Sequence, residues 1–380
     1  MSKRDLYIKA RASTPPSFWT RPTDWLPMPT VVSTDDTFVG LHAVFPSGQN
    51  FCAFSFTTNG GDYQVDWGDG TITTHTSNTT AEHEYDYTTY DPSNSTLSSR
   101  GYKQAMVIVT PLTGNLTTCN FQLRYTTVPA QNQAYATGFL DCILSMPNAD
   151  TGLSINFGGN NVRHTYVERF EMLNIGGCTN MANMFVSCNS LQSVPLFDTS
   201  NVTSMILMFQ GCFSLQTVPL FDTSSVVNMA SMFNTCRSLQ SVPLFDTSSV
   251  ANMGAMFNNC NSLQSVPLFD TSSVTVMGNM FQGCFSLQTV PPFDTSNVTA
   301  MGTMFQGCSS LNRTDIVCRV DVGFQNNQMS RAELVNVFNN LIDRSATTAA
   351  TIIITGNWGA SALTTAERDI ALNKNWIIIG

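Results

Sequence analysis

The feature that most constrains the fold is a repeat of 24 residues between positions 181 and 311. A Met-Phe pair recurs once per period, and its methionines are Met184, Met208, Met232, Met256, Met280 and Met304. A cysteine recurs with the same step, at Cys188, Cys212, Cys236, Cys260, Cys284 and Cys308. A fixed period of this length indicates a solenoid, in which each turn buries its apolar residues by stacking on its neighbours.

Each period predicts a short strand followed by a helix. The segment 190–195 is extended in character and ends in proline, which cannot donate to a strand ladder. Asp198–Ser200 then offers side-chain oxygens that cap helices. From Val202 onward, apolar residues fall at i, i+3, i+6 and i+7, which is one helical face, and Gly211 can end that helix. The expected fold of 181–312 is therefore an α/β leucine-rich-repeat solenoid.

The consensus V-P-x-F-D-T-S-x-V-x-x-M-x-x-M-F-x-x-C resembles the BspA-type leucine-rich repeats of surface proteins. The resemblance covers about a third of the chain. It implies recognition, adhesion or scaffolding, and it brings no catalytic residues with it.

The repeat cysteines lie in one column, at the spacing of neighbouring strands, about 5 Å. Disulfides or a metal site are alternatives for such a column, but cysteine is also a small and frequently buried hydrophobe. We expect a buried, reduced column that binds no metal.

A second column holds one aspartate per period. Negative charge is favoured at a helix N-terminus, so we expect these residues to act as helix caps. The alternative is calcium shared between neighbouring carboxylates, which would be the one cofactor of the chain. The residues are Asp198, Asp222, Asp246, Asp270 and Asp294.

The most variable outward position follows each cysteine and carries Phe213, Arg237 and Phe285 among polar residues. Aromatic residues and arginine dominate binding hot spots, so this column is the candidate recognition site. The alternative is that these are isolated exposed apolar residues of no consequence.

The segments on either side of the regular turns predict irregular caps of the solenoid, over 129–180 and 313–380. Before the repeats, 139–145, 153–159 and 167–177 are typical of strands that end in turns. After them, Ser330-x-x-Glu333 and Thr364-x-x-Glu367 each predict a capping box that opens a helix. Strands are expected over 351–355 and 376–380.

Residues 36–128 predict an antiparallel β-sandwich from six short strand candidates with turn residues between them. The segment Val65–Thr71, followed by His83-Glu-Tyr85, resembles the W-G-D-G-T…H-x-Y motif of the polycystic-kidney-disease (PKD) repeat, an immunoglobulin-like module. The resemblance implies a structural role for the turn. Its residues are Asp66, Trp67, Gly68, Asp69, Gly70, His83 and Tyr85.

Residues 1–35 predict an extended docking arm, since prolines interrupt any regular element there. Its first 21 residues hold five basic residues against Asp5, a charge of +4, whereas the whole chain carries −9. The remainder is therefore −13, and we expect the arm to bind an acidic neighbouring subunit. The arm residues are Lys3, Arg4, Lys9, Arg11, Trp19, Arg21 and Trp25.

Composition and motifs argue against several classes of function. An acidic chain does not favour nucleic-acid binding, and with only 11% charged residues it is typical of extracellular or virion proteins. Residues 1–21 lack the apolar stretch of a signal peptide, and no run of 18 apolar residues predicts a membrane span. The four histidines lack metal-ligand spacing, and no P-loop, G-x-S-x-G or H-E-x-x-H motif is present.

The order of arm, PKD-like segment and repeats resembles structural proteins of tailed bacteriophages. That resemblance implies a non-enzymatic virion protein, such as a capsid decoration, fibre or tail-associated protein. It would be present in multiple copies, bind capsid or tail subunits through its arm, and display the repeats to a host protein or glycan. The alternative is a bacterial surface adhesin of the BspA type, which needs an export route. A glycan-processing enzyme is a remote third class, and would show carboxylates clustered in a cleft.

Overall fold

The computed structural model describes residues 20–46, 50–121, 138–149, 166–175 and 177–380. The chain forms two compact units, Met1–Val202 and Thr203–Gly380, and each is described by itself. Among the described residues, no helix has the length and apolar character needed to cross a membrane. Five of the predicted arm residues, Lys3, Arg4, Lys9, Arg11 and Trp19, lie outside the described residues, as does the strand expected over 153–159.

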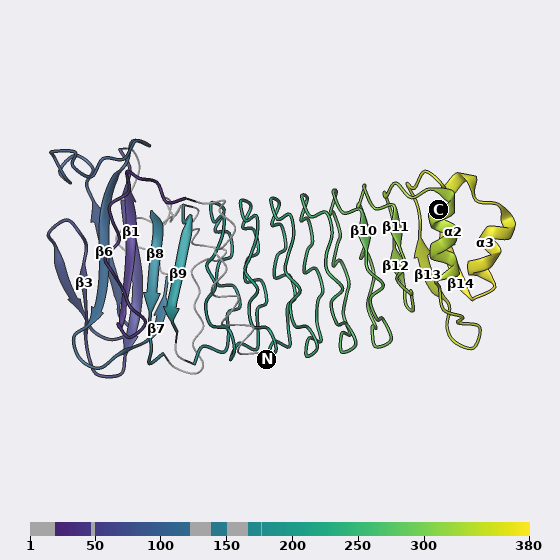
Figure 1. Ribbon diagram of the computed structural model, residues 1–380, viewed down its shortest axis with the longest axis horizontal. Coiled ribbons are helices and arrows are strands. Elements are labelled where there is room, and N and C mark those ends of the chain that lie inside the picture. The colour runs from purple at the N-terminus through teal and green to yellow at the C-terminus, as the bar shows by residue number, and fades with distance from the viewer. Residues whose placement is uncertain (1–19, 47–49, 122–137, 150–165, 176) are drawn as a thin grey trace, which may run out of the picture. The chain divides into compact units, whose positions relative to one another are not determined.

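The first unit contains two sheets (Figure 1). The larger has the strand order β4-β3-β6-β1-β8-β9 and is antiparallel except for the parallel pair β8–β9. Its strands are β1 (Thr37–Val44), β3 (Tyr63–Asp66), β4 (Ile72–His75), β6 (Lys103–Pro111), β8 (Phe139–Ser145) and β9 (Arg169–Asn174). The smaller is antiparallel, with the order β5-β2-β7. Its strands are β2 (Asn50–Thr58), β5 (Thr80–Tyr85) and β7 (Leu116–Asn120).

Aromatic side chains join the two sheets. Phe38 of β1 lies 5.4 Å, between ring centroids, from Phe139 of β8 and 6.2 Å from Phe54 of β2. It also lies 4.9 Å from Phe121, which follows β7. All four rings are fully buried. Burial of such rings is the largest apolar contribution that a small β-structure can make, so this cluster accounts for the pairing of the sheets.

Most strands of the first unit match those expected, and three findings differ. β7 ends at Asn120, where a strand was expected to begin and to continue to Tyr125; residues 122–125 lie outside the described residues. We did not predict β4, whose sequence I-T-T-H has no buried face: Ile72 is 57% exposed. In addition, β8 pairs with β1, so the hydrogen bonding of the larger sheet crosses the boundary drawn between residues 128 and 129. β8 and β9 were expected to be strands, but as part of a solenoid cap.

The second unit is a β-solenoid, and the prediction of a helix in every turn is wrong. The backbone hydrogen bonds run between turns: Met205 N–H donates to Asn228 O (3.1 Å), and Phe209 N–H donates to Met232 O (2.9 Å). Isolated parallel bridges link Ser204, Asn228, Asn252, Val276 and Ala300 in succession. The successive turns lie side by side in Figure 1. The α/β class is therefore corrected to a β-solenoid.

Two features explain the error. In the segment predicted to be helical, every third residue from Val202 to Met208 is buried. That spacing is close to the helical 3.6, but here it belongs to tight turns closed by hydrogen bonds between residues three apart. Leu207 and Gly211 also have left-handed backbone, with φ of 59° and 74°, which a right-handed helix cannot contain. Gly211 thus serves a left-handed turn position and does not end a helix.

That turn position predicts a stabilising substitution. Thr235 occupies it in the next turn with φ of 61°, and left-handed backbone costs a residue with a Cβ roughly 1–2 kcal/mol. We expect Thr235→Gly to raise the free energy of unfolding by about 1 kcal/mol, even after the entropy that glycine costs. Urea unfolding measures the change. Thr235→Ala keeps the strain and is the control; equal stability of the two variants would contradict the explanation.

The interior of the regular turns consists of apolar columns. Met208, Met232 and Met256 are fully buried, as the 24-residue period requires. The rings of Phe209, Phe233, Phe257, Phe281 and Phe305 stack with centroid separations of 5.6, 5.7, 5.7 and 6.0 Å. The turns therefore share one continuous apolar core.

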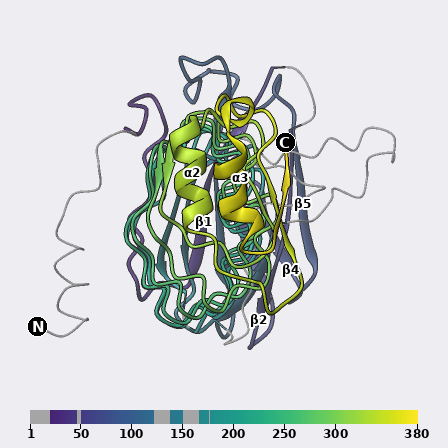
Figure 2. The same ribbon diagram turned by 90° about the vertical axis from the view of Figure 1, so that its right-hand side faces the viewer.

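The C-terminal cap combines three parallel strands with two helices, which lie side by side in Figure 2. Both predicted capping boxes are confirmed: Ser330 caps α2 (Arg331–Asn339) and Thr364 caps α3 (Thr365–Leu372). A short 3-10 helix, η2 (Ala360–Ala362), precedes α3. The strands are β12 (Val322–Gly323), β13 (Ala350–Ile353) and β14 (Trp376–Ile379).

The cap also continues the repeat in a way that the sequence conceals. Asn357 donates to Phe324 O (2.7 Å), as Cys308 Sγ does to Phe281 O (2.9 Å) two turns earlier. Asparagine has thus replaced cysteine at the same structural position. Phe324 stacks on Phe305 at 5.0 Å, so the column of rings extends into the cap.

Candidate recognition surface

The column predicted for recognition lies on the outside of the second unit. Phe213, Arg237 and Phe285 are exposed, and Phe285 retains 50% of its accessible surface. Hydrogen bonds between turns keep the column in register, since Ser238 N–H donates to Phe213 O (3.2 Å) and Ser262 N–H donates to Arg237 O (3.1 Å). Phe213 and Phe285 are three turns apart, about 14 Å at strand spacing.

The arginine of this column packs on its aromatic neighbour. The Arg237 guanidinium carbon lies 4.7 Å from the ring centroid of Phe213. A cation over an aromatic face is held by the ring quadrupole. The pair is therefore an ordered platform with one cationic edge, and Phe285 is a second and separate apolar contact.

Exposed glutamines follow the column three residues further along the turn. Gln240, Gln264 and Gln288 are exposed, and their backbones pair between turns, as in Gln240 N–H to Gln216 O (3.2 Å). Uncharged amides beside aromatic residues suit contacts with peptide or sugar groups, which hydrogen-bond and also have apolar faces. Phe213, Arg237, Phe285 and these three glutamines are called the recognition face below.

The aspartates do not cap helices, because the turns contain none. Each instead accepts a bond from the backbone two residues on, as in Ser272 N–H to Asp270 Oδ1 (3.0 Å), which is an Asx turn. The Ser272 hydroxyl and N–H lower the pKa of Asp270, although the neighbouring Asp246 and Asp294 raise it. All five aspartates of the column accept this bond from the serine N–H two residues on. They are Asp198, Asp222, Asp246, Asp270 and Asp294. Across the described part of the chain, no three His, Cys, Asp or Glu residues cluster closely enough to hold a metal ion.

A buried threonine follows each aspartate, and the sequence did not single it out. Thr247 is 1% exposed, and its hydroxyl donates to Asp270 O of the next turn (2.7 Å). Thr223 and Thr271 repeat this bond with 2.8 Å each, and Thr295 donates to Val317 O. The F-D-T-S consensus places three polar residues in a row, and only the path of the backbone decides which of them faces inward.

The threonine ladder predicts a polar contribution to stability. Thr247→Val keeps the side-chain shape but removes the part-buried hydrogen bond to the Asp270 carbonyl, which costs about 0.5–1.5 kcal/mol. Thr275→Val, at an exposed position where the preceding turns carry Ala251 and Val227, should change stability by less than about 0.5 kcal/mol. Urea unfolding of both variants measures the difference; equal effects would contradict the ladder's role.

The repeat cysteines are buried, and among the described residues no two cysteines form a disulfide. Cys236 and Cys260 donate to Phe209 O and Phe233 O of the preceding turn, each at 3.0 Å. Burial raises the pKa of Cys308 to about 12 and also raises that of Cys236. Raised pKa values disfavour the thiolate, which is the form that attacks electrophiles and binds metals. Cys188, Cys212 and Cys284 are likewise buried.

In the first unit, the turn Val65–Thr71 is held together by its own side chains. Asp66 accepts from Gly68 N–H (2.9 Å), and Asp69 accepts from Thr71 N–H (2.9 Å). Asp69 also contacts His83 Nε2 (2.7 Å). The other residues of the motif also contribute to the turn. Trp67 stacks on His83, and the Tyr85 hydroxyl donates to Trp67 O. Gly68 and Gly70 have positive φ.

A cleft of about 520 Å³ opens beside this turn, lined in part by Asp69, Glu84, Asp86 and Asp91. Burial raises the pKa of Asp69, but bonds from Thr71 and His83 outweigh it and leave that pKa below the usual value. Bonds from Thr88 lower the pKa of Asp86. Desolvation raises the pKa of Asp91, but bonds from Ser93, Thr96 and Ser95 outweigh it and leave that pKa lowered. A glycosidase needs a carboxylic acid that keeps its proton near neutral pH. The pKa values of Asp69, Asp86 and Asp91 are shifted in the opposite direction.

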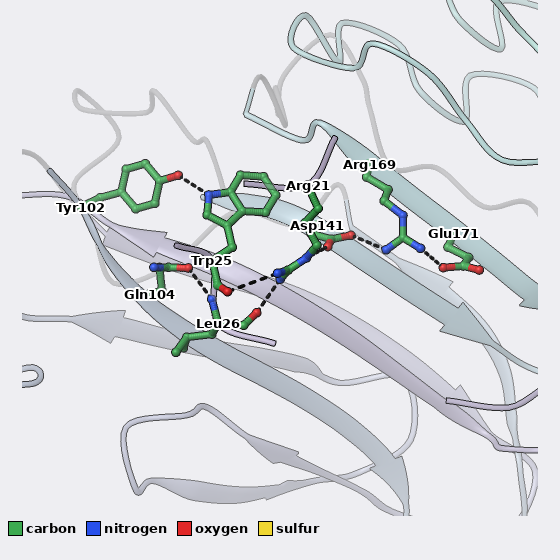
Figure 3. A network of polar contacts seen from close by, with 8 residues as sticks. All are labelled: Arg21, Trp25, Leu26, Tyr102, Gln104, Asp141, Arg169 and Glu171. Atoms are coloured by element: carbon green, nitrogen blue, oxygen red, sulfur yellow. Dashed lines mark hydrogen bonds and ion pairs between the residues drawn. The ribbon is translucent and has the colours of Figure 1, made fainter. Parts of the chain in front are cut away.

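The described base of the arm packs on its own unit (Figure 3). Arg21 Nε donates to Asp141 Oδ2 (2.8 Å), and Trp25 Nε1 donates to Tyr102 OH (2.9 Å). Trp25 is 3% exposed and lies in a cluster with Leu41 and Leu140. Arg21 and Trp25 therefore belong to the folded unit.

Asp141 is a buried charge that the sequence analysis overlooked. It is fully buried on β8 and accepts bonds from both Arg21 and Arg169 (3.1 Å). Arg169 also pairs with Glu171. A single aspartate in the apolar run F-L-D-C-I-L-S was the available signal, because an ionised group is buried only with partners.

Comparison with known proteins bears on the repeats. No curated protein matches the chain. The sequence profile of a family described as Mycoplasma protein of unknown function, DUF285, matches residues 153–265 and 263–340. The matches span the regular turns and enter the C-terminal cap. The part of the chain that forms the solenoid is therefore similar to the repeats of this family.

Proposed function

We propose that the chain is a non-enzymatic repeat surface protein whose recognition face binds a protein or glycan partner. The observation that carries the proposal is the exposure of Phe213, Arg237 and Phe285 along one line of an otherwise regular scaffold. The interior columns are the same from turn to turn, whereas this outward column varies. Variation on a constant scaffold is what a binding surface of a repeat protein needs.

Adhesion at a cell surface is the more general form of the proposal, and the repeats support it directly. A virion component is the second form. It is favoured by the basic sequence of residues 1–19, of charge +3 by the count of Lys3, Arg4, Lys9 and Arg11 against Asp5. Immunogold labelling distinguishes the two, since the label would lie on the envelope of producing cells in one case and on released particles in the other.

Binding arrays test the recognition face. The full chain, fluorescently labelled, is applied to arrays of glycans and of extracellular proteins, beside the variant Phe213→Ala/Arg237→Ala/Phe285→Ala. Each 1.4 kcal/mol of binding free energy that is lost weakens binding about tenfold, and a hot-spot residue contributes at least about that much. We expect the triple variant to bind at least about tenfold more weakly than the wild type to every array partner that the wild type binds.

A matched control replaces exposed residues elsewhere on the same unit. Val227→Ala/Thr299→Ala alters two exposed positions of another column and should leave binding unchanged. Partners that bind the triple variant as tightly as the wild type would refute the assignment of the face.

A further inference from the structure

A second exposed feature of the second unit is a column of leucines. Leu220, Leu244 and Leu268 are 45%, 59% and 58% exposed, and the exposed Pro292 takes the same position in the next turn. Each lies beside a buried phenylalanine, and the rings of Phe245 and Phe269 are 6.4 Å apart. The leucines are therefore neighbours, and they form one apolar stripe across successive turns.

The aspartate column runs beside this stripe. Each aspartate follows its leucine by two residues, and the phenylalanine between them points inward. Asp246 and Asp294 both act electrostatically on Asp270, so their charges are close enough to repel. The leucines with Asp222, Asp246, Asp270 and Asp294 are called the leucine–aspartate stripe.

Charge identifies the kind of segment that fits the stripe. Residues 203–312 contain four acidic residues, all in the stripe, and one basic residue, Arg237. A ligand must therefore combine apolar side chains with positive charge. Residues 1–19 have that composition, with Leu6, Ile8 and Phe18 among four basic residues. Long basic side chains can cover apolar surface and still place their charge beside a carboxylate.

We propose that residues 1–19 of a second copy of this chain bind the leucine–aspartate stripe and thereby link copies into an assembly. Arg21 and Trp25 hold the described base of the arm on its own first unit. Apolar contact supplies the affinity, and the aspartates select a basic segment and hold it in register. The proposal is independent of the recognition face, whose residues it does not use.

Analytical ultracentrifugation of the full chain tests the proposal over a range of protein and salt concentrations. We expect reversible association that weakens as salt rises, because exposed ion pairs are screened. Leu244→Gln/Leu268→Gln should weaken association at least about tenfold. Lys3→Gln/Arg4→Gln/Lys9→Gln/Arg11→Gln should do the same, and a synthetic peptide of residues 1–19 should compete. Val227→Gln, at an apolar position 51% exposed outside the stripe, is the control and should associate normally.

Charge reversal separates the stripe from general loss of solubility. Asp246→Lys/Asp270→Lys should abolish association with wild-type arms and recover it with Lys9→Glu/Arg11→Glu in the other copy. A full chain that stays monomeric at high concentration would overturn the proposal, as would association that is unchanged in the leucine and arm variants. Either result would leave the binding arrays unaffected, so failure here is distinguishable from failure of the proposed function.

Discussion

Phe257→Ala is expected to lower the free energy of unfolding of the solenoid by about 3–5 kcal/mol, the cost of removing a large buried ring. The side chain is fully buried, and its ring stacks between Phe233 and Phe281 at 5.7 Å on either side. Its loss opens a cavity in the middle of the column and removes contacts with both neighbouring turns. Because repeat proteins gain stability from each interface between turns, the damage should extend to those turns.

Phe285→Ala is the matched control for this variant. It makes the same chemical change 28 positions later, at a ring that is 50% exposed. We expect a change below about 0.5 kcal/mol. Hydrogen exchange of peptides from the turns measures both variants. Similar loss of protection in the two would mean that the inner and outer columns are misassigned.

Removal of both arginines that contact Asp141 should also be severe. Arg21→Met/Arg169→Met leaves the fully buried carboxylate without either guanidinium, and breaking a buried ion pair in this way costs about 3–5 kcal/mol. Either single substitution should cost less, since one partner remains. Hydrogen exchange of the β8 amides measures the loss of stability within the first unit. A global unfolding curve is less suitable, because it would combine the unfolding of both units.

A third change in that background identifies the cause. Asp141→Asn removes the charge, so adding it to the double variant should recover stability if the unpaired carboxylate is responsible. No recovery would mean that the arginines act mainly by packing and, for Arg21, by its bonds to the backbone of Trp25 and Leu26. The triple variant can therefore contradict the explanation that the unpaired carboxylate causes the loss of stability.

The sequence was sufficient to predict the stacked turns and which residues fill them. A 24-residue step repeats the same contacts in each turn, so Met232 and Phe233 had to lie where Met208 and Phe209 lie. Capping boxes at Ser330 and Thr364 were also predictable, because they are local in the chain. The helix in each turn was not excluded from sequence, since Val202, Met205 and Phe209 suit a helical face as well as a tight turn.

Features that depend on contacts distant in sequence were missed. Thr247 bonds a carbonyl of the next turn, and Asp141 lies 120 residues from Arg21. Neither pairing leaves a local pattern. The recognition face was predictable as a column, but the stacking of Arg237 on Phe213 required the side chains to be placed.

Oxidation of methionine by hydrogen peroxide, read residue by residue by mass spectrometry, tests most directly whether the repeats form one continuous buried core. Met232, Met256 and Met280 are fully buried. We predict that they react at least about tenfold more slowly in the folded protein than in denaturant, since oxidation follows exposure. Reaction of these residues at the same rate in both states would contradict the stacked solenoid and everything placed on its surface.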